Sequence, residues 1–419
     1  MKIDSVVCAP VRAGFFFDDQ AAIRAGAGHD GFAYVGEPVT PGFRAIREPG
    51  EALSVMLVLE DGSIAFGDCA AVQYSGAGGR DPLFRAARAA AVVQEVVAPA
   101  LLGREAESFR GLAGQIESIS VDGSALHTAI RYGVSQALLG AAAMSRRVTM
   151  AEVVAEEYRT GIPIARIPIF AQSGDDRYLN VEKMIAKEVD VLPHGLINEP
   201  RSKVGAQGEI LLDYVRWVRD RVLQLRRSDS YAPVLHFDTY GTIGLVFGIN
   251  PARIADYLAR LAEAAAPFRL QIEHPLDAGS KERQIEEMSR LRAELANKGV
   301  PVALVVDEWC NTKEDIQDFV AARAADVIHV KMPDLGGVGN TVEALLHVRS
   351  EGLSAYCGGT CNETDRSAQV SAHIAMATGA HQVLAKPGMG VDEGLMVVGN
   401  EMARVEALIA ARELIGGRS

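Results

Sequence analysis

The stretch "DVIHVKMPDLGG" (residues 326–337) combines an apolar run with a single lysine. Val327, Ile328 and Val330 are typical of a buried strand, and Lys331 follows them directly before a proline and two glycines end the pattern. A lysine at the end of an apolar strand needs an acidic partner or a chemical task, because burial disfavours its charged form. The surroundings of Lys331 therefore decide how the stretch is interpreted.

The same pattern, an apolar strand followed by a helix, recurs after Pro163. Eight strands are expected to end at or near these residues: Gln172, His194, Asp238, Glu273, Asp307, Lys331, Cys357 and Leu384. Helices are expected at 181–188, 209–226, 251–265, 281–298, 313–324, 340–351, 365–378 and 400–413. Eight strands alternating with eight helices over roughly 250 residues predict a (β/α)8 TIM-like barrel, here over residues 161–419.

Residues 1–160 mix strands and helices without the regular alternation seen after Pro163, and they are expected to form a separate α+β domain. Residues 52–69 read as a β-hairpin that turns at Asp61-Gly62. Ala-rich stretches near 83–100, 104–119 and 124–145 predict helices. The glycine-rich segment 73–81 lacks the GK[ST] of a phosphate-binding loop, so we interpret it as a loop that closes over the barrel mouth.

Composition excludes several classes of function. The 419-residue chain has a formal net charge of −12, which argues against binding to nucleic acid or to an anionic membrane surface. The five cysteines form no CxxC pair, and the N-terminus has no long apolar segment typical of a signal peptide. No apolar run approaches the roughly 20 residues of a membrane span. These features predict a cytoplasmic protein with a small-molecule substrate.

Three successive strands of the predicted barrel end in carboxylates. Asp238 ends "VLHFD", Glu273 ends "LQIE" and Asp307 ends "LVVD", at a spacing of about one βα unit. The C-terminal strand ends of such a barrel meet at one mouth, where three negative charges require a neutralising partner. A hard divalent cation with all-oxygen ligands favours Mg²⁺. The alternative is that each carboxylate caps the next helix or pairs with an arginine.

Lys331 lies on the strand after Asp307 and is expected beside the same metal. Burial and a neighbouring cation both lower the pKa of a lysine, which makes it a candidate general base near neutral pH. We therefore expect removal of a proton α to a metal-bound carboxylate, with the metal stabilising the enolate-like product. The alternative is a simple ion pair of Lys331 with Asp307 or Glu273.

Histidines and a glycine-rich turn complete the candidate site. His194 ends "DVLPH" across the mouth from Lys331 and can act on the opposite face of a substrate. Strand alternation also directs His236 and His329 into the barrel, where His236 is expected to be a packed residue. In "CGGTCNET" (357–364), the backbone N–H groups of Thr360 and Cys361 are candidates to bind a carboxylate at a helix N-terminus.

Several longer motifs resemble the methylaspartate ammonia-lyase family of the enolase superfamily. The motifs are "FDDQ", "GAGHDGF", "GDCAAVQYSGAGGRDPLF", "LHTAIRYG", "FAQSGDDRY", "DEWCNT", "PDLGGV", "AYCGGTCNET" and "VLAKPGMGVDEG". The resemblance runs from the N-terminus to about residue 405. It implies an N-terminal capping domain on the barrel, a homodimer, and reversible elimination of ammonia from (2S,3S)-3-methylaspartate to give mesaconate, with Mg²⁺ and an activating monovalent cation such as K⁺.

The resemblance also implies a role for individual residues. Asp238, Glu273 and Asp307 match the metal ligands, Lys331 matches the base that takes the C3 proton, and His194 matches the group on the other side of the substrate. The positions that match substrate contacts are Gln172, His329, Thr360 and Cys361, with Gln73 and Leu384 as further pocket-lining positions.

Three residues depart from the family pattern and bear on which 3-substituents the pocket accepts. His329 stands where the family usually has Gln, His274 where it has Gly, and Met332 where it has Thr. Two other classes stay open on the residues alone. One is a different enolase-superfamily reaction, such as racemisation or dehydration of a carboxylate. The other is a barrel that binds a metal or a partner without catalysis, which the three carboxylates together with Lys331 disfavour.

Overall fold

The computed structural model, which describes residues 1–74 and 80–416, contains a closed barrel of eight parallel strands. The strands follow one another around the barrel in chain order, and the last pairs with the first. They are β8 (Ile169–Phe170), β9 (Val191–His194), β10 (Val234–Asp238), β11 (Leu270–Glu273), β12 (Val302–Val306), β13 (Val327–Lys331), β14 (Ser354–Gly358) and β15 (Gln382–Leu384). The predicted barrel is confirmed.

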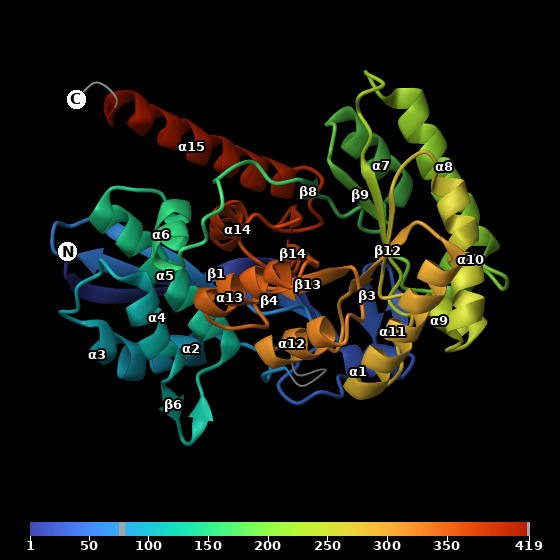
Figure 1. Cartoon of the computed structure of the whole chain (residues 1–419). Coiled ribbons are helices and arrows are strands. Elements are labelled where there is room, and N and C mark those ends of the chain that lie inside the picture. The colour runs from blue at the N-terminus through green and yellow to red at the C-terminus, as the bar shows by residue number, and fades with distance from the viewer. Residues whose placement is uncertain (75–79, 417–419) are drawn as a thin grey trace.

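Helices surround this barrel. They are α7 (Arg177–Ala186), α8 (Glu209–Leu225), α9 (Thr242–Phe247), α10 (Pro251–Ala265), α11 (Lys281–Lys298), α12 (Lys313–Ala321), α13 (Val338–Ser350), α14 (Asp365–Thr378) and α15 (Glu393–Gly416), with the short π-helix η2 (Pro200–Val204). The short helix α9 was not expected, and α15 begins earlier than predicted. In Figure 1, α15 runs from the barrel to the C-terminus and packs against α14.

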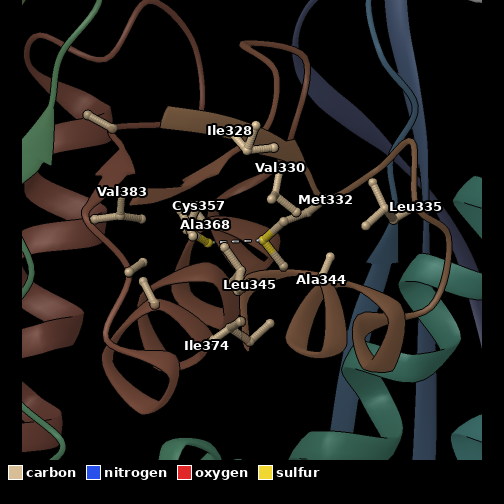
Figure 2. Close-up of a cluster of buried hydrophobic side chains, with 14 of the residues drawn as sticks. Ile328, Val330, Met332, Leu335, Ala344, Leu345, Cys357, Ala368, Ile374 and Val383 are labelled. Carbon is tan, nitrogen blue, oxygen red and sulfur yellow. Dashed lines mark hydrogen bonds between the residues drawn. The ribbon is translucent and has the colours of Figure 1, made fainter. Parts of the chain in front are cut away.

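Two apolar layers hold the barrel together. The interior is filled by one cluster of buried side chains: Phe170, Val191, Val234, Val305, Val327, Tyr356 and Leu384. The outer face of the strands packs against the helices. Figure 2 shows this second layer, where Met332 and Cys357 approach each other between the strands and the surrounding helices, with their sulfur atoms 3.8 Å apart. Alternate residues of β13 therefore serve the two layers.

The N-terminal residues build an antiparallel sheet with the strand order β1-β4-β5. Asp61 accepts a hydrogen bond from the backbone N–H of Ser63, and Gly62 has a φ of +83°, so the predicted hairpin turn is confirmed. The strands are β1 (Ile3–Asp18), β4 (Arg47–Leu59) and β5 (Ile64–Cys69), with the short pairs β2 (Gly28–Asp30) with β3 (Ala33–Val35) and β6 (Ser120–Val121) with β7 (Ser124–Ala125). The helices are α1 (Gln20–Arg24), α2 (Ala86–Val92), η1 (Val93–Val97), α3 (Ala98–Leu101), α4 (Phe109–Glu117), α5 (Thr128–Arg146) and α6 (Met150–Glu157).

A glycine contact joins helix α5 closely to strand β5. A Cβ atom on Gly67 would lie 2.2 Å from the carbonyl oxygen of Gly133, and one on Gly133 would lie 2.4 Å from the backbone nitrogen of Cys69. Only glycine permits this approach at either position. The contact fixes the end of β5, and Gln73 follows that end directly toward the barrel.

The closing loop and membrane-spanning helices, both considered from the sequence, can be described only for the residues that the structure covers. Residues 75–79 of the glycine-rich segment 73–81 lie outside the described residues, so the proposed closing loop has no structural account here. Within residues 1–74 and 80–416, every helix is too short or too polar to traverse a lipid bilayer.

Candidate active site at the barrel mouth

One pocket of about 90 Å³ lies at the C-terminal ends of the barrel strands. Its lining includes every residue that the sequence proposed for the site: Gln73, Gln172, His194, Asp238, Glu273, Asp307, His329, Lys331, Thr360, Cys361 and Leu384. These residues are distributed along more than 300 positions of the chain and meet because parallel strands deliver their ends to one face of the barrel. The structure therefore brings the predicted residues together, and their individual roles stay predictions.

The three carboxylates of the predicted metal centre are buried at neighbouring strand ends. Asp238 and Glu273 are register partners at the ends of β10 and β11, and Asp307 is the first residue after β12. Among the described residues, the group whose ligand atoms all lie within 4.8 Å of one another is Glu273, Asp307 and His329. Asp238 instead directs its Oδ2 toward the Nε2 of His194, 3.4 Å away.

Neighbouring histidines and a lysine lower the pKa of two of these carboxylates. Burial raises the pKa of Glu273, but the adjacent His329 and His236 outweigh burial and lower this pKa to about 2. Burial likewise opposes ionisation of Asp307, yet Lys331 and His329 hold its pKa well below the usual value. Burial and the nearby charge of Glu273 raise the pKa of Asp238. Two of the three carboxylates are thus held ionised even in the absence of a metal.

The donor set fits a hard divalent cation. Asp238, Glu273 and Asp307 offer carboxylate oxygens, the ligands that Mg²⁺ prefers. Glu308 adds a fourth acidic group to the pocket, whereas Lys331 is the ammonium group in its lining. A bound cation would relieve the repulsion among these buried negative charges. The residues present therefore suit the Mg²⁺ that the sequence predicted.

Lys331 takes part in an ion pair in this structure. Its Nζ lies 2.7 Å from Asp307 Oδ1 and 3.4 Å from Glu308 Oε1. Burial lowers the pKa of Lys331, but Asp307 and Glu308 outweigh burial and hold it above the usual value. The alternative of an ion pair with Asp307 is therefore present here. A cation bound to Asp307 would compete with Lys331 for the same carboxylate, which is the condition that a base function requires.

His194 presents a defined face to the pocket. Its Nδ1 accepts a hydrogen bond from the backbone N–H of Leu196, so in the neutral ring the proton resides on Nε2. The Nε2 atom points toward Asp238. The ring lies 5.9 Å from that of Phe170, centroid to centroid, in a stacked orientation. His194 is thus a positioned donor on the side of the pocket opposite Lys331.

In the turn after β14, the backbone N–H of Thr360 has a different acceptor from the one that the sequence hypothesis gave it. The backbone N–H of Thr360 donates to Glu363 Oε2 at 3.0 Å, so it is not free to bind a carboxylate. The Sγ of Cys361 lies 3.5 Å from Gln73 Oε1, and the amide nitrogen of Gln73 donates to Asp18 Oδ2 at 2.6 Å. The hypothesis of a carboxylate held by both backbone N–H groups is therefore wrong for Thr360, whose hydroxyl remains near the pocket.

Seven lining residues were not assigned to the site from the sequence: Val72, Tyr74, Arg80, Tyr240, Glu308, Tyr356 and Gly359. Arg80 donates to both oxygens of Asp334, at 2.9 and 3.0 Å, and so ties the N-terminal domain to the loop after β13. Glu308 directly follows Asp307 in "DEWCNT", and that adjacency was an available signal. Tyr240 and Tyr356 carried no comparable signal, because aromatic residues are common in barrel cores.

The three departures from the family pattern occupy different places. Met332 is fully buried in the outer layer (Figure 2), with its sulfur 2.9 Å from Ser371 Oγ. It does not line the pocket. His274 is buried next to Glu273, a predicted metal ligand, and also lies outside the lining. His329 lies within it. Of the three, His329 is the departure positioned to touch a bound substrate or metal.

Comparison with known proteins decides the family. Family profiles described as the methylaspartate ammonia-lyase N-terminus and C-terminus match residues 1–159 and 161–411. The chain belongs to the methylaspartate ammonia-lyase family. The members of this family are carbon–nitrogen lyases.

Individual relatives agree over the whole length. The methylaspartate ammonia-lyase of Clostridium tetanomorphum is 56% identical over 413 residues, which cover 99% of this chain and 100% of the relative. The crystal structure of beta-methylaspartase from the same organism, a Mg complex, has a TM-score of 0.95 and covers 98% of this chain and all of the other. The Citrobacter amalonaticus lyase, solved with (2S,3S)-3-methylaspartic acid, is 50% identical with a TM-score of 0.96, covering 98% and 100%.

A more distant likeness concerns the fold alone. Muconate cycloisomerase from Pseudomonas fluorescens is 16% identical with a TM-score of 0.60, and the alignment covers 95% of this chain and 88% of the other. This likeness agrees with the predicted architecture of a (β/α)8 barrel with an N-terminal α+β region.

Proposed function

We propose that this protein is a methylaspartate ammonia-lyase that reversibly eliminates ammonia from (2S,3S)-3-methylaspartate to give mesaconate. The observation that carries the proposal is the single pocket lined by all of the residues that match the family's metal, catalytic and substrate positions. Full-length similarity to named methylaspartate ammonia-lyases supports it.

In this proposal Lys331 is the base that removes the C3 proton. The C3 proton moves to Nζ first and leaves its electron pair on the adjacent carboxylate as an enolate-like intermediate. That electron pair then forms the C2–C3 double bond while the C2–N bond breaks, and the ammonium group leaves as ammonia. His194 lies across the pocket and donates from Nε2 toward the opposite side of the substrate. Two groups on opposite faces allow proton removal and departure of the amine to be assisted separately.

Asp238, Glu273 and Asp307 would hold Mg²⁺ in the same proposal. When bound, the cation supplies positive charge that stabilises the negative charge developing on the substrate carboxylate. The fold buries the three carboxylates, and His236 holds one oxygen of Glu273 in position. His236 Nε2 lies 2.8 Å from Glu273 Oε2, which leaves Oε1 directed toward the pocket side.

Substrate contacts complete the proposal. The residues that would contact the substrate are Gln172, His329, Thr360 and Cys361, with Gln73 and Leu384 lining the remainder. Leu384 belongs to the apolar interior cluster and offers a surface for the 3-methyl group. Activation by a monovalent cation such as K⁺, a homodimer, and a domain boundary near residue 160 are further parts of the proposal that rest on the family resemblance.

The test is a direct assay of the purified protein with 3-methylaspartate, following ammonia and mesaconate together, with Mg²⁺ and after treatment with a chelator. We expect both products in equal amounts with Mg²⁺ and their loss after chelation. Lys331→Met should be inactive, whereas Lys298→Met, a change to an exposed lysine on α11, should match the wild type. Racemisation or dehydration without release of ammonia would refute the proposal.

A further inference from the structure

The ring of His329 is fixed on every side. Its Nδ1 lies 2.8 Å from Glu273 Oε1 and 3.1 Å from Asp307 Oδ1. One face stacks on Tyr356, with ring centroids 4.2 Å apart and an interplanar angle of 26°. A Cβ atom on Gly358 would lie 1.9 Å from Nε2, so glycine at that position makes room for the imidazole. These contacts hold the ring with Nδ1 facing the two carboxylates.

A single proton on Nδ1 cannot serve both of these oxygens. An N–H group points at one acceptor with good geometry, and Glu273 receives that hydrogen bond here. Asp307 Oδ1 approaches the same nitrogen without a second proton to share. A cation placed among the three atoms would satisfy all of them, because it attracts each lone pair without preference for one direction.

The distances from Nδ1 to the two carboxylate oxygens agree with a cation bound among these three atoms. Bonds of about 2.1 Å in an octahedral site place neighbouring ligands about 3 Å apart. The distances of 2.8 and 3.1 Å from Nδ1 to the two oxygens match this edge length. His236 and Gln382 hold the other oxygen of Glu273 through a chain of contacts at 2.8 and 3.1 Å, so Oε1 is left for the cation.

We propose that Nδ1 of His329 is a ligand of the divalent cation in this site, together with Glu273 and Asp307. This inference rests on the proposed metal centre and deepens it. Imidazole suits first-row transition ions, whereas carboxylate and water ligands suit Mg²⁺. The consequence is a site more selective for ions such as Co²⁺ or Ni²⁺ than an otherwise identical site with glutamine at position 329.

Ligation through Nδ1 leaves the other ring nitrogen available. Nε2 is buried and has no hydrogen-bond partner among the described residues. In a neutral ring bound to a cation through Nδ1, the proton resides on Nε2. His329 can therefore bind the cation with one nitrogen and offer an N–H donor with the other, which is compatible with its proposed contact to substrate.

The decisive experiment detects the nitrogen directly. Metal-free protein is loaded with Mn²⁺ alone, and electron spin-echo envelope modulation is recorded for wild type, His329→Gln and a matched control, His194→Gln. We expect a directly bonded nitrogen in the wild type, its loss in His329→Gln, and its retention in His194→Gln. Wild-type protein labelled with ¹⁵N-histidine should show the corresponding isotope change, which requires no variant to fold.

Titration calorimetry with Co²⁺ and with Mg²⁺ measures the selectivity. His329→Gln should raise the Kd for Co²⁺ about tenfold or more, within the range usual for altered metal surroundings, and raise that for Mg²⁺ by less than about threefold. No directly bonded nitrogen in the wild-type Mn²⁺ spectrum would overturn the inference. If that spectrum lacks nitrogen while ammonia is still released, the proposed function stands and only the ligand assignment fails.

Discussion

Lys386 Nζ lies 2.8 Å from Glu363 Oε2, and both side chains are fully buried. The pair organises the turn that follows β14. Glu363 also accepts hydrogen bonds from the hydroxyl of Tyr132 at 2.6 Å and from the backbone N–H of Thr360 at 3.0 Å, and Lys386 donates to the carbonyl oxygen of Gly358 at 3.0 Å. Helix α5 of the N-terminal region is thereby linked to the pocket through one buried charge pair.

Lys386→Met should destabilise the protein strongly, because it leaves the carboxylate of Glu363 buried without its cation. Loss of one partner of a buried pair typically costs about 3–5 kcal/mol. The measurement is the free energy of unfolding in urea. The matched control is the double variant Lys386→Met/Glu363→Gln, which removes both charges and should recover at least about 1 kcal/mol of that loss. Equal stability of the single and double variants would contradict this interpretation.

The metal ligands give a second prediction. Asp238→Asn, Glu273→Gln and Asp307→Asn should each remove most of the activity and weaken the binding of Mg²⁺, because each replaces an anionic oxygen with a neutral amide. Glu308→Gln changes an acidic residue of the same pocket that is not assigned as a ligand, and it should weaken Mg²⁺ binding less. Isothermal titration with Mg²⁺ separates the two cases. Unchanged affinity in all three ligand variants would remove the basis for this metal centre.

The third prediction distinguishes Lys331 from His194. Lys331→Ala should abolish deuterium exchange at C3 of (2S,3S)-3-methylaspartate in heavy water, because the proposed mechanism assigns removal of that proton to Lys331. His194→Ala should slow the release of ammonia while exchange at C3 continues. Nuclear magnetic resonance of recovered substrate measures both. Exchange that persists in Lys331→Ala would show that Lys331 serves only as the ion-pair partner of Asp307.

A fourth prediction concerns acid stability at His373. Its Nδ1 accepts from the backbone N–H of Ala151, and its Nε2 lies 2.9 Å from Glu401 Oε1, so the neutral ring satisfies both contacts. Burial lowers the pKa of His373 below its usual value of 6.5. The hydrogen bond with His373 lowers the pKa of Glu401, although burial opposes this.

Both shifts have the same consequence for stability. A group whose pKa is lowered by folding stabilises the native state above its unfolded pKa and loses that contribution as the pH falls. Between the unfolded and folded pKa of His373, the free energy of unfolding should therefore fall with the pH by up to about 1.4 kcal/mol per unit from this group. His373→Gln should show a shallower slope below pH 6.5 in urea titrations. Parallel slopes for variant and wild type would contradict the assignment.

The sequence predicted the barrel and most of its site because strand ends carry a local signal. Asp238, Glu273 and Lys331 each close a short apolar run, and a parallel barrel brings such ends together whatever the details of packing. The hairpin at Asp61-Gly62 was equally local. Helix ends were less precise, as the early start of α15 shows, because capping depends on neighbouring segments.

Other features depend on contacts between distant segments and left no local signal. The salt bridge of Arg80 with Asp334 and the buried pair of Glu363 with Lys386 join residues that single-sequence patterns do not relate. The backbone N–H of Thr360 was misassigned for the same reason, because its acceptor is the side chain of Glu363. Alternation along β13 correctly placed His329 inward, but it gave no information on the packing of its ring against Tyr356 and Gly358.

The last prediction concerns catalysis by the variants of His329 in the presence of Mg²⁺. Glutamine, the residue usual in the family, retains an N–H donor for a substrate oxygen, and Mg²⁺ accepts water in place of a lost imidazole. His329→Gln should therefore keep kcat/KM for 3-methylaspartate within about tenfold of the wild type, or about 1.4 kcal/mol.

His329→Ala should lose more, on the order of 1–3 kcal/mol, because it leaves a buried substrate oxygen without a donor. The measurement is kcat/KM of both variants for 3-methylaspartate and for aspartate. The second substrate separates a lost polar contact from an enlarged apolar pocket, since only the former should lower both values equally. An alanine variant that equals the wild type on both substrates would show that His329 does not touch the substrate.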